Sequence, residues 1–493
     1  KHPRAQCDCP PLPVWAGLAA HRMGRPSLVL AGVICLLIVP SAIGLAKLDD
    51  IEALRELYES AGGAGWKLAD NAPGDGMLLP GGNNGWDLNS DPCPFNFTNG
   101  WYGVACVDPC YTPIDGEDCR FGRITGIQMP FNTMLGSIPN NVFSKLNNLT
   151  IFDVSHNSLS GTLPTQVGKL RNMMVFRMGH NLLSGTIPTE IQTIGSHVPG
   201  DEGALAFEDL PTAAQESPTT YTYTPPASLT ETMGLQQLDL SYNSLNGTIP
   251  TTIGELINLV SVDVSHNPSL GGDGCCTDTD SYYNSFYGYN TTLPTEVGML
   301  KKLQVLHMDF SGFTRHIPTE VGAMRSLKFW RVKGSFTTNQ VSGSIPSEFG
   351  SLKKMTEFMM QNNSLSGTLP SQLGTMDALE VFKVQDNKIS GTIPDMFATL
   401  EKLNEWDTFG NKMEGDLPSS IGLLGNLDYL YMQNEHSDVI RNHYCKQRIE
   451  SSAIGRKFNW MVLGREYINY KTLSACANPY DVAGSFDALS GDV

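Results

Sequence analysis

The chain has 493 residues, with 33 Lys and Arg against 50 Asp and Glu, so its formal net charge is −17. This acidic balance argues against a nucleic-acid-binding protein and against a protein that docks on anionic membranes, because both need a broad basic surface. Hydrophobic residues make up 41% of the chain, which is enough for a folded core.

The amino-terminal segment predicts a secretory leader. A short basic stretch precedes an apolar run, residues 28–45, with small residues near its end at Gly44 and Ala46. This arrangement is typical of a signal peptide, here residues 23–46, cleaved after its last residue. An uncleaved signal anchor is the alternative, because the run is almost long enough to span a bilayer. Residues 1–22 are interpreted as upstream or non-native leader sequence.

An amphipathic helix is predicted directly after the leader. It begins at Asp49, has acidic residues in its first turn, and ends at Gly62 and Gly63. Its apolar residues recur at helical spacing and are Ile51, Leu54, Leu57 and Tyr58. One face of this helix is therefore expected to be buried.

Cysteine usage indicates an oxidising compartment. Of 11 cysteines, three leave with the leader, and the remaining even number is expected of a disulfide-bonded protein. These are Cys93, Cys106, Cys110, Cys119, Cys275, Cys276, Cys445 and Cys476. Spacing alone does not fix their pairing. A zinc site is the competing interpretation, but Cys-x₃-Cys-x₈-Cys without a flanking His fits zinc poorly.

Asn-x-Ser/Thr motifs permit N-glycosylation, although motifs this short often arise by chance. They begin at Asn96, Asn148, Asn246, Asn290 and Asn362.

A repeat marked by Ile-Pro or Leu-Pro fills residues 122–434. Most successive prolines lie 24 or 25 residues apart, and three longer gaps place insertions near residues 195–232, 270–290 and 335–338. The marking prolines are Pro139, Pro164, Pro188, Pro250, Pro294, Pro318, Pro346, Pro370, Pro394 and Pro418.

Each repeat predicts one coil that begins with a short strand. In the unit 149–172, Phe152 and Val154 alternate with polar residues, which indicates a strand with one buried face. An Asn follows each strand, where its amide can satisfy backbone groups as the chain turns. These residues are Asn157, Asn181, Asn243, Asn267, Asn363, Asn387 and Asn411. Because a single coil cannot bury its apolar side, neighbouring coils are expected to stack.

This pattern resembles the plant-type leucine-rich repeat, LxxLxxLxLxxNxLxGxIPxxLGxL, of receptor-like kinases, receptor-like proteins and polygalacturonase-inhibiting proteins. The resemblance covers residues 122–434. It implies an α/β repeat solenoid, a right-handed leucine-rich repeat superhelix of about eleven coils with a parallel β-sheet on its concave side. No kinase follows the repeats in this sequence.

The resemblance extends to an amino-terminal cap. Residues 101–106 are similar to the family's Trp-x-Gly-Val-x-Cys element, which implies that Cys93 pairs with Cys106. Cys110 and Cys119 then form an additional pair.

Disulfide-bonded caps are expected at both ends, because a terminal coil would otherwise expose apolar surface. The amino-terminal cap is residues 47–121, and the carboxy-terminal cap and tail are residues 435–493. In the second cap we expect Cys445 to pair with Cys476.

No catalytic, cofactor or metal site is predicted. Gly-x-Ser-x-Gly, Walker A and His-Glu-x-x-His motifs are absent, so the sequence does not predict an enzyme. His156, His180 and His266 each precede the turn Asn of a coil. We interpret them as solvent-facing repeat positions and not as metal ligands.

The strand register predicts which side chains face outward from the sheet. The expected central column is Gln128, Asp153, Arg177, Asp239, Asp263, His307, Arg331, Met359, Lys383, Asp407 and Tyr431.

The sixth and seventh coils break the repeat. Ser311 replaces the turn Asn, Arg315 replaces a Gly, and four residues enter at 335–338. Phe310 and Phe329 are expected to face outward on adjacent strands, and exposed aromatics beside Arg are typical of binding hot spots. A drifted repeat with a harmless bulge is the alternative. The candidate binding residues are His307, Asp309, Phe310, Phe329, Arg331, Lys333, Met359 and Tyr431.

Together these features predict a secreted or surface-exposed, non-enzymatic recognition protein. Its partner would be a protein, peptide or glycan on the concave face. Membrane attachment would need a co-receptor or an uncleaved signal anchor. The alternative is a structural or assembly component of an extracellular matrix, wall or surface complex.

Overall fold

In the computed structural model, every described residue belongs to one compact unit, Gly44–Val493. The described residues are 45–46, 48–66, 103–107, 121–196, 234–271, 293–335, 338–396, 399–413, 418, 420, 424, 426–431, 461–462 and 467–468.

Helix α2 (Leu48–Ser60) confirms the predicted amphipathic helix. Leu54 and Leu57 are buried in the core. Asp50 is also buried, and its Oδ2 accepts a hydrogen bond from the backbone N–H of Ile124 at 3.2 Å. The helix is thereby attached to the first long strand by a side-chain hydrogen bond as well as by apolar packing.

In the described residues the main sheet has 13 strands, and it begins with two short or irregular pairings to β3 (Phe121–Gln128). β2 (Val104–Val107) lies antiparallel to β3 and carries Cys106, which is disulfide-bonded to a residue outside the described part of the chain. β1 (Leu45–Ala46) lies parallel to β3. Cleavage of the expected leader after Ala46 would therefore remove β1 from this edge.

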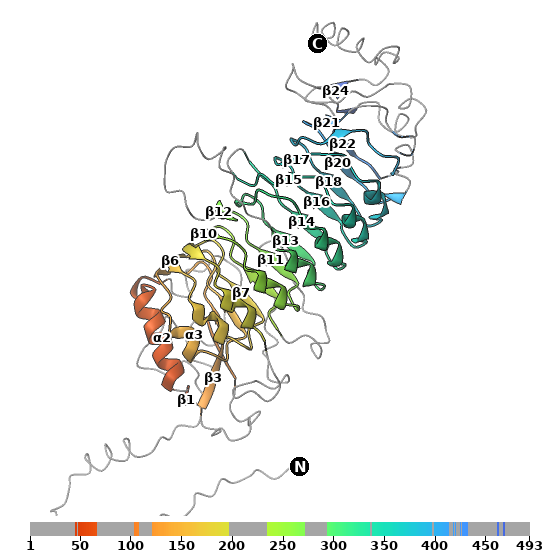
Figure 1. Cartoon of the computed structure of the whole chain (residues 1–493). Helices are drawn as coiled ribbons and strands as arrows, with labels where there is room; N and C mark the ends of the chain where they lie inside the picture. Colours follow the sequence, from red (N-terminus) through yellow and green to blue (C-terminus); the bar gives the residue numbers. More distant parts are fainter. Residues whose placement is uncertain are drawn as a thin grey trace, which may run out of the picture. The chain divides into compact units, whose positions relative to one another are not determined.

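From β3 onward the main sheet grows by one parallel strand per repeat, in chain order (Figure 1). The strands are β5 (Ile151–Asp153), β7 (Val175–Arg177), β9 (Gln237–Asp239), β11 (Ser261–Asp263), β13 (Val305–His307), β14 (Phe329–Arg331), β16 (Glu357–Met359), β18 (Val381–Lys383), β20 (Glu405–Asp407) and β22 (Tyr429–Tyr431). Stacked coils with a continuous parallel sheet confirm the predicted leucine-rich repeat solenoid.

A second set of short parallel strands follows the main-sheet strands. β4 (Leu135–Gly136), β6 (Ser158–Thr162), β8 (Leu182–Thr186), β10 (Ser244–Gly247) and β12 (Ser269–Leu270) form a five-stranded sheet. Further along the chain, β15 (Ser342–Gly343) pairs with β17 (Ser364–Leu365), and β19 (Ser390–Gly391) pairs with β21 (Lys412–Met413). A separate antiparallel pair is β23 (Met461–Val462) with β24 (Tyr467–Ile468).

The return segments are short helices. α3 (Val142–Lys145) and η2 (Gly63–Gly65) lie near the amino-terminal edge. The other segments are 3₁₀ helices: η4 (Thr165–Lys169), η5 (Thr189–Thr193), η8 (Thr251–Glu255), η9 (Thr295–Met299), η10 (Thr319–Ala323), η11 (Ser347–Ser351) and η12 (Ser371–Thr375). A repeat proline in an extended conformation precedes each of these seven helices, for example Pro164 before η4. The proline ring restricts this position, which fixes where each return segment starts.

The two long insertions leave the main sheet continuous. β7 pairs with β9, with Val175 opposite Gln237, although residues 197–233 separate the two coils. β11 pairs with β13 in the same way across residues 272–292. Both inserted segments lie outside the described residues.

The core is one continuous column of apolar side chains. Phe152 and Phe176 stack at 5.6 Å between ring centroids, and Phe382 stacks on Trp406 at 4.4 Å. Trp330 is 1% exposed and belongs to the same core.

The turn asparagines form the predicted ladder. Asn181 accepts a hydrogen bond from the Leu159 N–H at 2.9 Å and donates to the Val154 and Met178 carbonyl oxygens at 3.0 Å each. The same pattern recurs along the stack. Each asparagine thus joins its own turn to the preceding coil.

At the irregular coils, a serine takes the place of one turn asparagine, and an asparagine returns in the next coil. Ser311 donates to the Val264 carbonyl oxygen at 3.0 Å. In the next coil Asn339 accepts from the Phe313 N–H at 3.1 Å, so this residue, which is absent from the predicted set, is the ladder asparagine of that coil. The insertion had moved it four positions away from its expected place.

No helix in the described residues is both long and apolar enough to span a bilayer.

Candidate binding surface

The outward face of the main sheet carries the central column expected from the sequence. Cα pairing aligns Asp263 with His307, His307 with Arg331, and Arg331 with Met359. The alignment continues without a shift in register to Gln128 in one direction and to Tyr431 in the other. Because the resemblance identifies this face with the concave side of the solenoid, it is the first candidate for partner binding.

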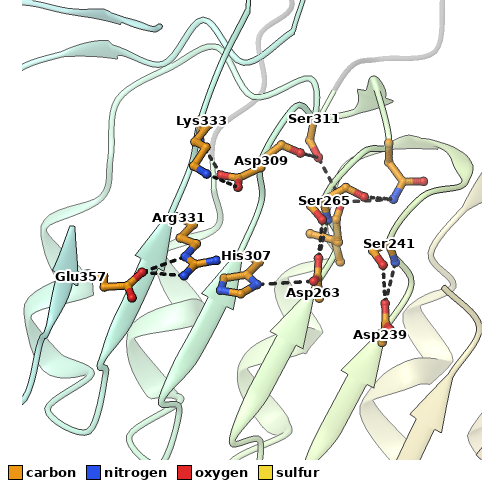
Figure 2. A network of polar contacts seen from close by, with 12 residues as sticks. Asp239, Ser241, Asp263, Ser265, His307, Asp309, Ser311, Arg331, Lys333 and Glu357 are labelled. Atoms are coloured by element: carbon orange, nitrogen blue, oxygen red, sulfur yellow. Dashed lines mark hydrogen bonds and ion pairs between the residues drawn. The ribbon is translucent and has the colours of Figure 1, made fainter. Parts of the chain in front are cut away.

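In the first coils, the aspartates of the column close their own turns. Asp263 Oδ1 accepts from the N–H and Oγ–H of Ser265 at 2.9 and 2.6 Å, and Asp239 makes the same two bonds with Ser241 (Figure 2). Burial, together with the negative charge of Asp263, raises the pKa of Asp239 to about 6. The hydrogen bonds of these carboxylates are therefore made mainly within the fold.

Between β11 and β16, polar and charged side chains pair across neighbouring strands. His307 Nδ1 lies 3.4 Å from Asp263 Oδ2. Burial opposes ionisation of Asp263, but the hydrogen bonds from His307 and Ser265 outweigh it and lower the pKa. Arg331 donates from Nε and Nη2 to Glu357 Oε2 at 3.0 and 2.6 Å.

A third pair, Asp309 with Lys333, lies beside the Arg331–Glu357 pair at the ends of the strands (Figure 2). The Lys333 backbone N–H donates to Asp309 Oδ1 at 2.7 Å, and Lys333 Nζ lies 3.8 Å from Asp309 Oδ2. Burial raises the pKa of Asp309, although Lys333 partly offsets this effect. Farther along, Lys383 and Glu405 pair at 2.8 Å. This half of the face thus presents matched opposite charges.

The structure groups some candidate residues and separates others. Arg331, His307 and Met359 are direct neighbours in the central column, and Phe329 lies in the same strand as Arg331. His307 and Asp309 are buried, so they support this surface more than they cover it. Tyr431 lies on β22, at the far end of the column.

Phe310 and Phe329, which were expected to form one patch, do not occupy equivalent positions on adjacent strands. Phe329 aligns with Val305, five residues before Phe310. Phe310 lies beyond the end of β13, in a left-handed conformation with φ 53°, and its ring lies 4.9 Å from that of His266. The outward register therefore ends before Phe310, because the backbone turns there.

Phe310 belongs instead to a ring column, the residues immediately before the turn positions of six consecutive coils: Phe131, His156, His180, Tyr242, His266 and Phe310. The three histidines of this position were recognised from the sequence, whereas the aromatic residues at the same position were not. Alignment on the turn asparagine, without regard to residue type, would have found them. No group of three potential metal ligands occurs within the described part of the chain.

The glycosylation motifs differ in accessibility. Asn148 is 2% exposed, and its Oδ1 lies 3.4 Å from Asn172 Nδ2, so it is a poor acceptor in the folded coil. Asn362 is exposed, and Asn246 is half-buried in β10. Asn96 and Asn290 lie outside the described residues, as do all cysteines except Cys106.

Comparisons with known proteins agree with the architecture. The family model described as Leucine Rich Repeat matches residues 148–170 and 234–256. No curated protein matches the chain significantly in sequence.

A solved plant structure shares the fold. The chain is similar to the leucine-rich repeat ectodomain of the receptor kinase GASSHO1/SCHENGEN3 from Arabidopsis thaliana, in complex with CASPARIAN STRIP INTEGRITY FACTOR 2, with 24% identity and a TM-score of 0.51 over 70% of this chain and 32% of that one. It is also similar to the Arabidopsis HAESA ectodomain in complex with an IDA peptide hormone (22% identity, TM-score 0.48, 80% and 53% covered). A third similar structure is a TDR receptor (22% identity, TM-score 0.46, 62% and 47% covered). The match spans less than two thirds of each of these structures.

Proposed function

Because the chain is a leucine-rich repeat solenoid of the plant type, we propose that it is a secreted, non-enzymatic recognition protein that binds a peptide or protein partner on the outward face of its main sheet. The structure that shares its fold, a receptor kinase ectodomain, is described as a complex with CASPARIAN STRIP INTEGRITY FACTOR 2. The disulfide at Cys106 and the expected leader support an extracellular location.

The distribution of long polar side chains carries the proposal for the site. At the last outward position of each strand, the early coils have only small residues: Ser155, Gly179, Ser241 and Ser265. The later coils have Lys333, Gln361 and Gln385 at the equivalent position, beside Arg331 and Met359 of the central column. Side chains that can reach a partner are therefore concentrated from β14 onward.

Ion pairs in this region can also exchange one of their contacts for a contact with a binding partner. The Arg331–Glu357 and Lys383–Glu405 pairs are each about one-fifth exposed, with side-chain exposures of 21% and 22% and of 23% and 20%. A polar partner can take over part of each pair without leaving a charge unpaired, which limits the desolvation penalty of binding.

The test uses matched variants on the two halves of the sheet. Peptides selected from a displayed library on the wild-type protein are measured by calorimetry against Arg331→Ala and Arg177→Ala. Both arginines lie in the central column, and both pair with a carboxylate across strands, Arg177 with Asp153 at 3.4 Å. We expect Arg331→Ala to weaken binding by about 2 kcal/mol, or roughly 30-fold, and Arg177→Ala to have much less effect.

Phe329→Ala and Gln237→Ala repeat the comparison at the first position of the strands. Equal losses in the early-coil and late-coil variants would show that affinity is spread along the whole sheet. Selected peptides that bind all four variants as tightly as the wild-type protein would rule out this surface.

A further inference from the structure

The ring column is a continuous stack along the ends of the main-sheet strands. Successive centroids from Phe131 to His266 lie 4.1, 4.0, 3.9 and 3.8 Å apart, and their planes differ by 9° to 17°. All six residues have a left-handed backbone, with φ between 49° and 57°. The shared backbone conformation directs each ring onto the ring of the next coil.

Every imidazole in the column lies between two other rings. His156 is stacked between Phe131 and His180, and His180 is stacked between His156 and Tyr242. His266 is stacked on Tyr242 on one face, and the Phe310 ring on its other side is tilted by 52°. Water cannot solvate the stacked faces, so the stack favours the neutral imidazole over the imidazolium cation.

The surrounding charges act in both directions. Burial lowers the pKa of His156, and the negative charge of Asp153 partly offsets it. Burial likewise lowers the pKa of His180, with a further lowering from His156 and His266. Asp263 acts against these effects.

His266 has the most varied environment. Burial again lowers its pKa, Asp309 and Asp263 raise it, and Lys333 of the following coil lowers it. The depressed pKa of all three imidazoles therefore has burial in the stack as its main cause.

His156 and His180 cannot easily carry a proton at the same time. Their centroids are 4.0 Å apart, so two imidazolium cations would repel each other at van der Waals distance. The pair is expected to titrate in two separate steps, of which the second opposes stacking.

We propose that the ring column is an acid-sensitive seam: protonation of its imidazoles separates the rings and loosens the strand ends of the early coils. The later coils lack this device, because the equivalent positions are Gly334, Asn362, Asp386 and Gly410. Acidification would therefore act on one half of the solenoid and leave the other half packed.

The sign of the pH dependence follows from the depressed pKa values. An opened coil binds protons at the ordinary histidine pKa of about 6.5, whereas the closed stack binds them only at lower pH. The stabilisation by the column is complete above about pH 6.5 and decreases as the pH falls below that value. Asp239, whose raised pKa is about 6, acts in the opposite direction and is present in every variant below.

The test replaces two imidazoles by rings that the column already accepts. Phe131 and Tyr242 show that Phe and Tyr fit this left-handed position, so the variant is His156→Phe with His180→Tyr. Amide hydrogen exchange is measured at the Asn157 and Asn181 N–H groups, which donate across coils to His180 and Tyr242 carbonyl oxygens at 3.1 Å.

We expect protection of these two amides in the wild-type protein to fall at least ~3-fold between pH 7.5 and 5.0, after correction for intrinsic exchange. Protection at the Asn362 N–H, in a later coil, should stay constant, and so should all three amides in the double variant. His316→Thr is the control, because His316 lies outside the column and Thr occupies the equivalent repeat position in other coils. This control should retain the wild-type behaviour.

Equal losses in the wild-type protein and the double variant would overturn the proposal, as would an equal loss at Asn362. If the double variant does not fold, an NMR titration of the wild-type imidazoles decides. Apparent pKa values at or above about 6.5 for His156, His180 and His266 would contradict the seam, and lower values would support it.

Discussion

At the scale of single residues, side-chain amides supply hydrogen bonds that the main sheet cannot make where its strands end. Asn387 shows the arrangement: its Oδ1 accepts from the Leu365 N–H at 2.9 Å, and its Nδ2 donates to the Met360 and Val384 carbonyl oxygens at 2.9 and 3.0 Å. Loss of such an amide leaves several buried backbone groups without partners, and each of these carries a desolvation penalty.

We therefore expect Asn387→Ala to lower the free energy of unfolding by about 3 kcal/mol, as measured by urea denaturation. Lys388→Ala is the matched control, because Lys388 is the next residue and its side chain is exposed. This control should change stability by less than ~0.5 kcal/mol. A similar small effect for both variants would show that water replaces the amide at little cost.

Asp407 is a residue whose charge opposes folding. Burial, with a smaller contribution from Glu405, raises its pKa to about 7, although the Phe409 N–H donates to its Oδ1 at 3.0 Å. The folded protein thus holds this proton more tightly than the unfolded chain, where the ordinary pKa is about 3.9. The stabilisation linked to this proton is present below about pH 4 and is lost as the pH rises through about 7.

Asp407→Asn keeps the hydrogen-bond acceptor and removes the charge. We expect the variant to gain stability relative to wild type when the pH is raised from 4.5 to 8, by an amount on the order of 1 kcal/mol. Thermal unfolding at the two pH values measures this difference, with the exposed Asp428→Asn as control. A gain that does not depend on pH would contradict the assignment of the proton to Asp407.

At the scale of elements, the insertion after β14 lies inside an otherwise regular coil. Asn339 performs the ladder role, and the chain from Phe329 to Gly334 keeps the register of its neighbours. Without residues 335–338, Gly334 would be followed directly by Asn339, which is the spacing found in the other coils.

Deletion of residues 335–338 is therefore expected to change the free energy of unfolding by less than ~1 kcal/mol, because long or short surface excursions cost little in loop entropy. Asn339→Ala in the same coil should cost about 3 kcal/mol. Peptide binding by the deletion variant separates the two interpretations of this coil. Unchanged binding supports a drifted repeat, and lost binding makes the inserted loop part of the site.

Elements that repeat along the chain could be predicted from the sequence, whereas departures from the repeat could not. The inward positions of Phe152 and Val154 follow from alternation, and the turn asparagines follow from a fixed spacing. The outward position expected for Phe310 was wrong: strict alternation from His307 would already have placed Phe310 on the inward side, and the left-handed backbone at Phe310 ends the alternation there. Asn339 was missed because the insertion changed its spacing to the preceding strand.

At the scale of the whole molecule, the stacking partners of a side chain come from other coils. Residues that are distant in sequence must therefore be compared by their position within the repeat. Such a comparison predicts the central column, which depends only on strand register. It does not predict which charges pair. The Arg331–Glu357 contact depends on the reach and rotamer of two long side chains, and sequence spacing contains neither.

The parallel pairing of β7 with β9 holds two coils together that are neighbours in the structure but far apart in the sequence. The Met178 and His180 N–H groups donate to Asp239 and Ser241 carbonyl oxygens at 2.8 Å each, and these bonds do not depend on how the chain travels between the coils. A break between residues 196 and 234 would leave them intact. In engineering terms, this junction is a natural place to split the protein into two pieces that find each other through a shared sheet edge, or to insert a foreign domain.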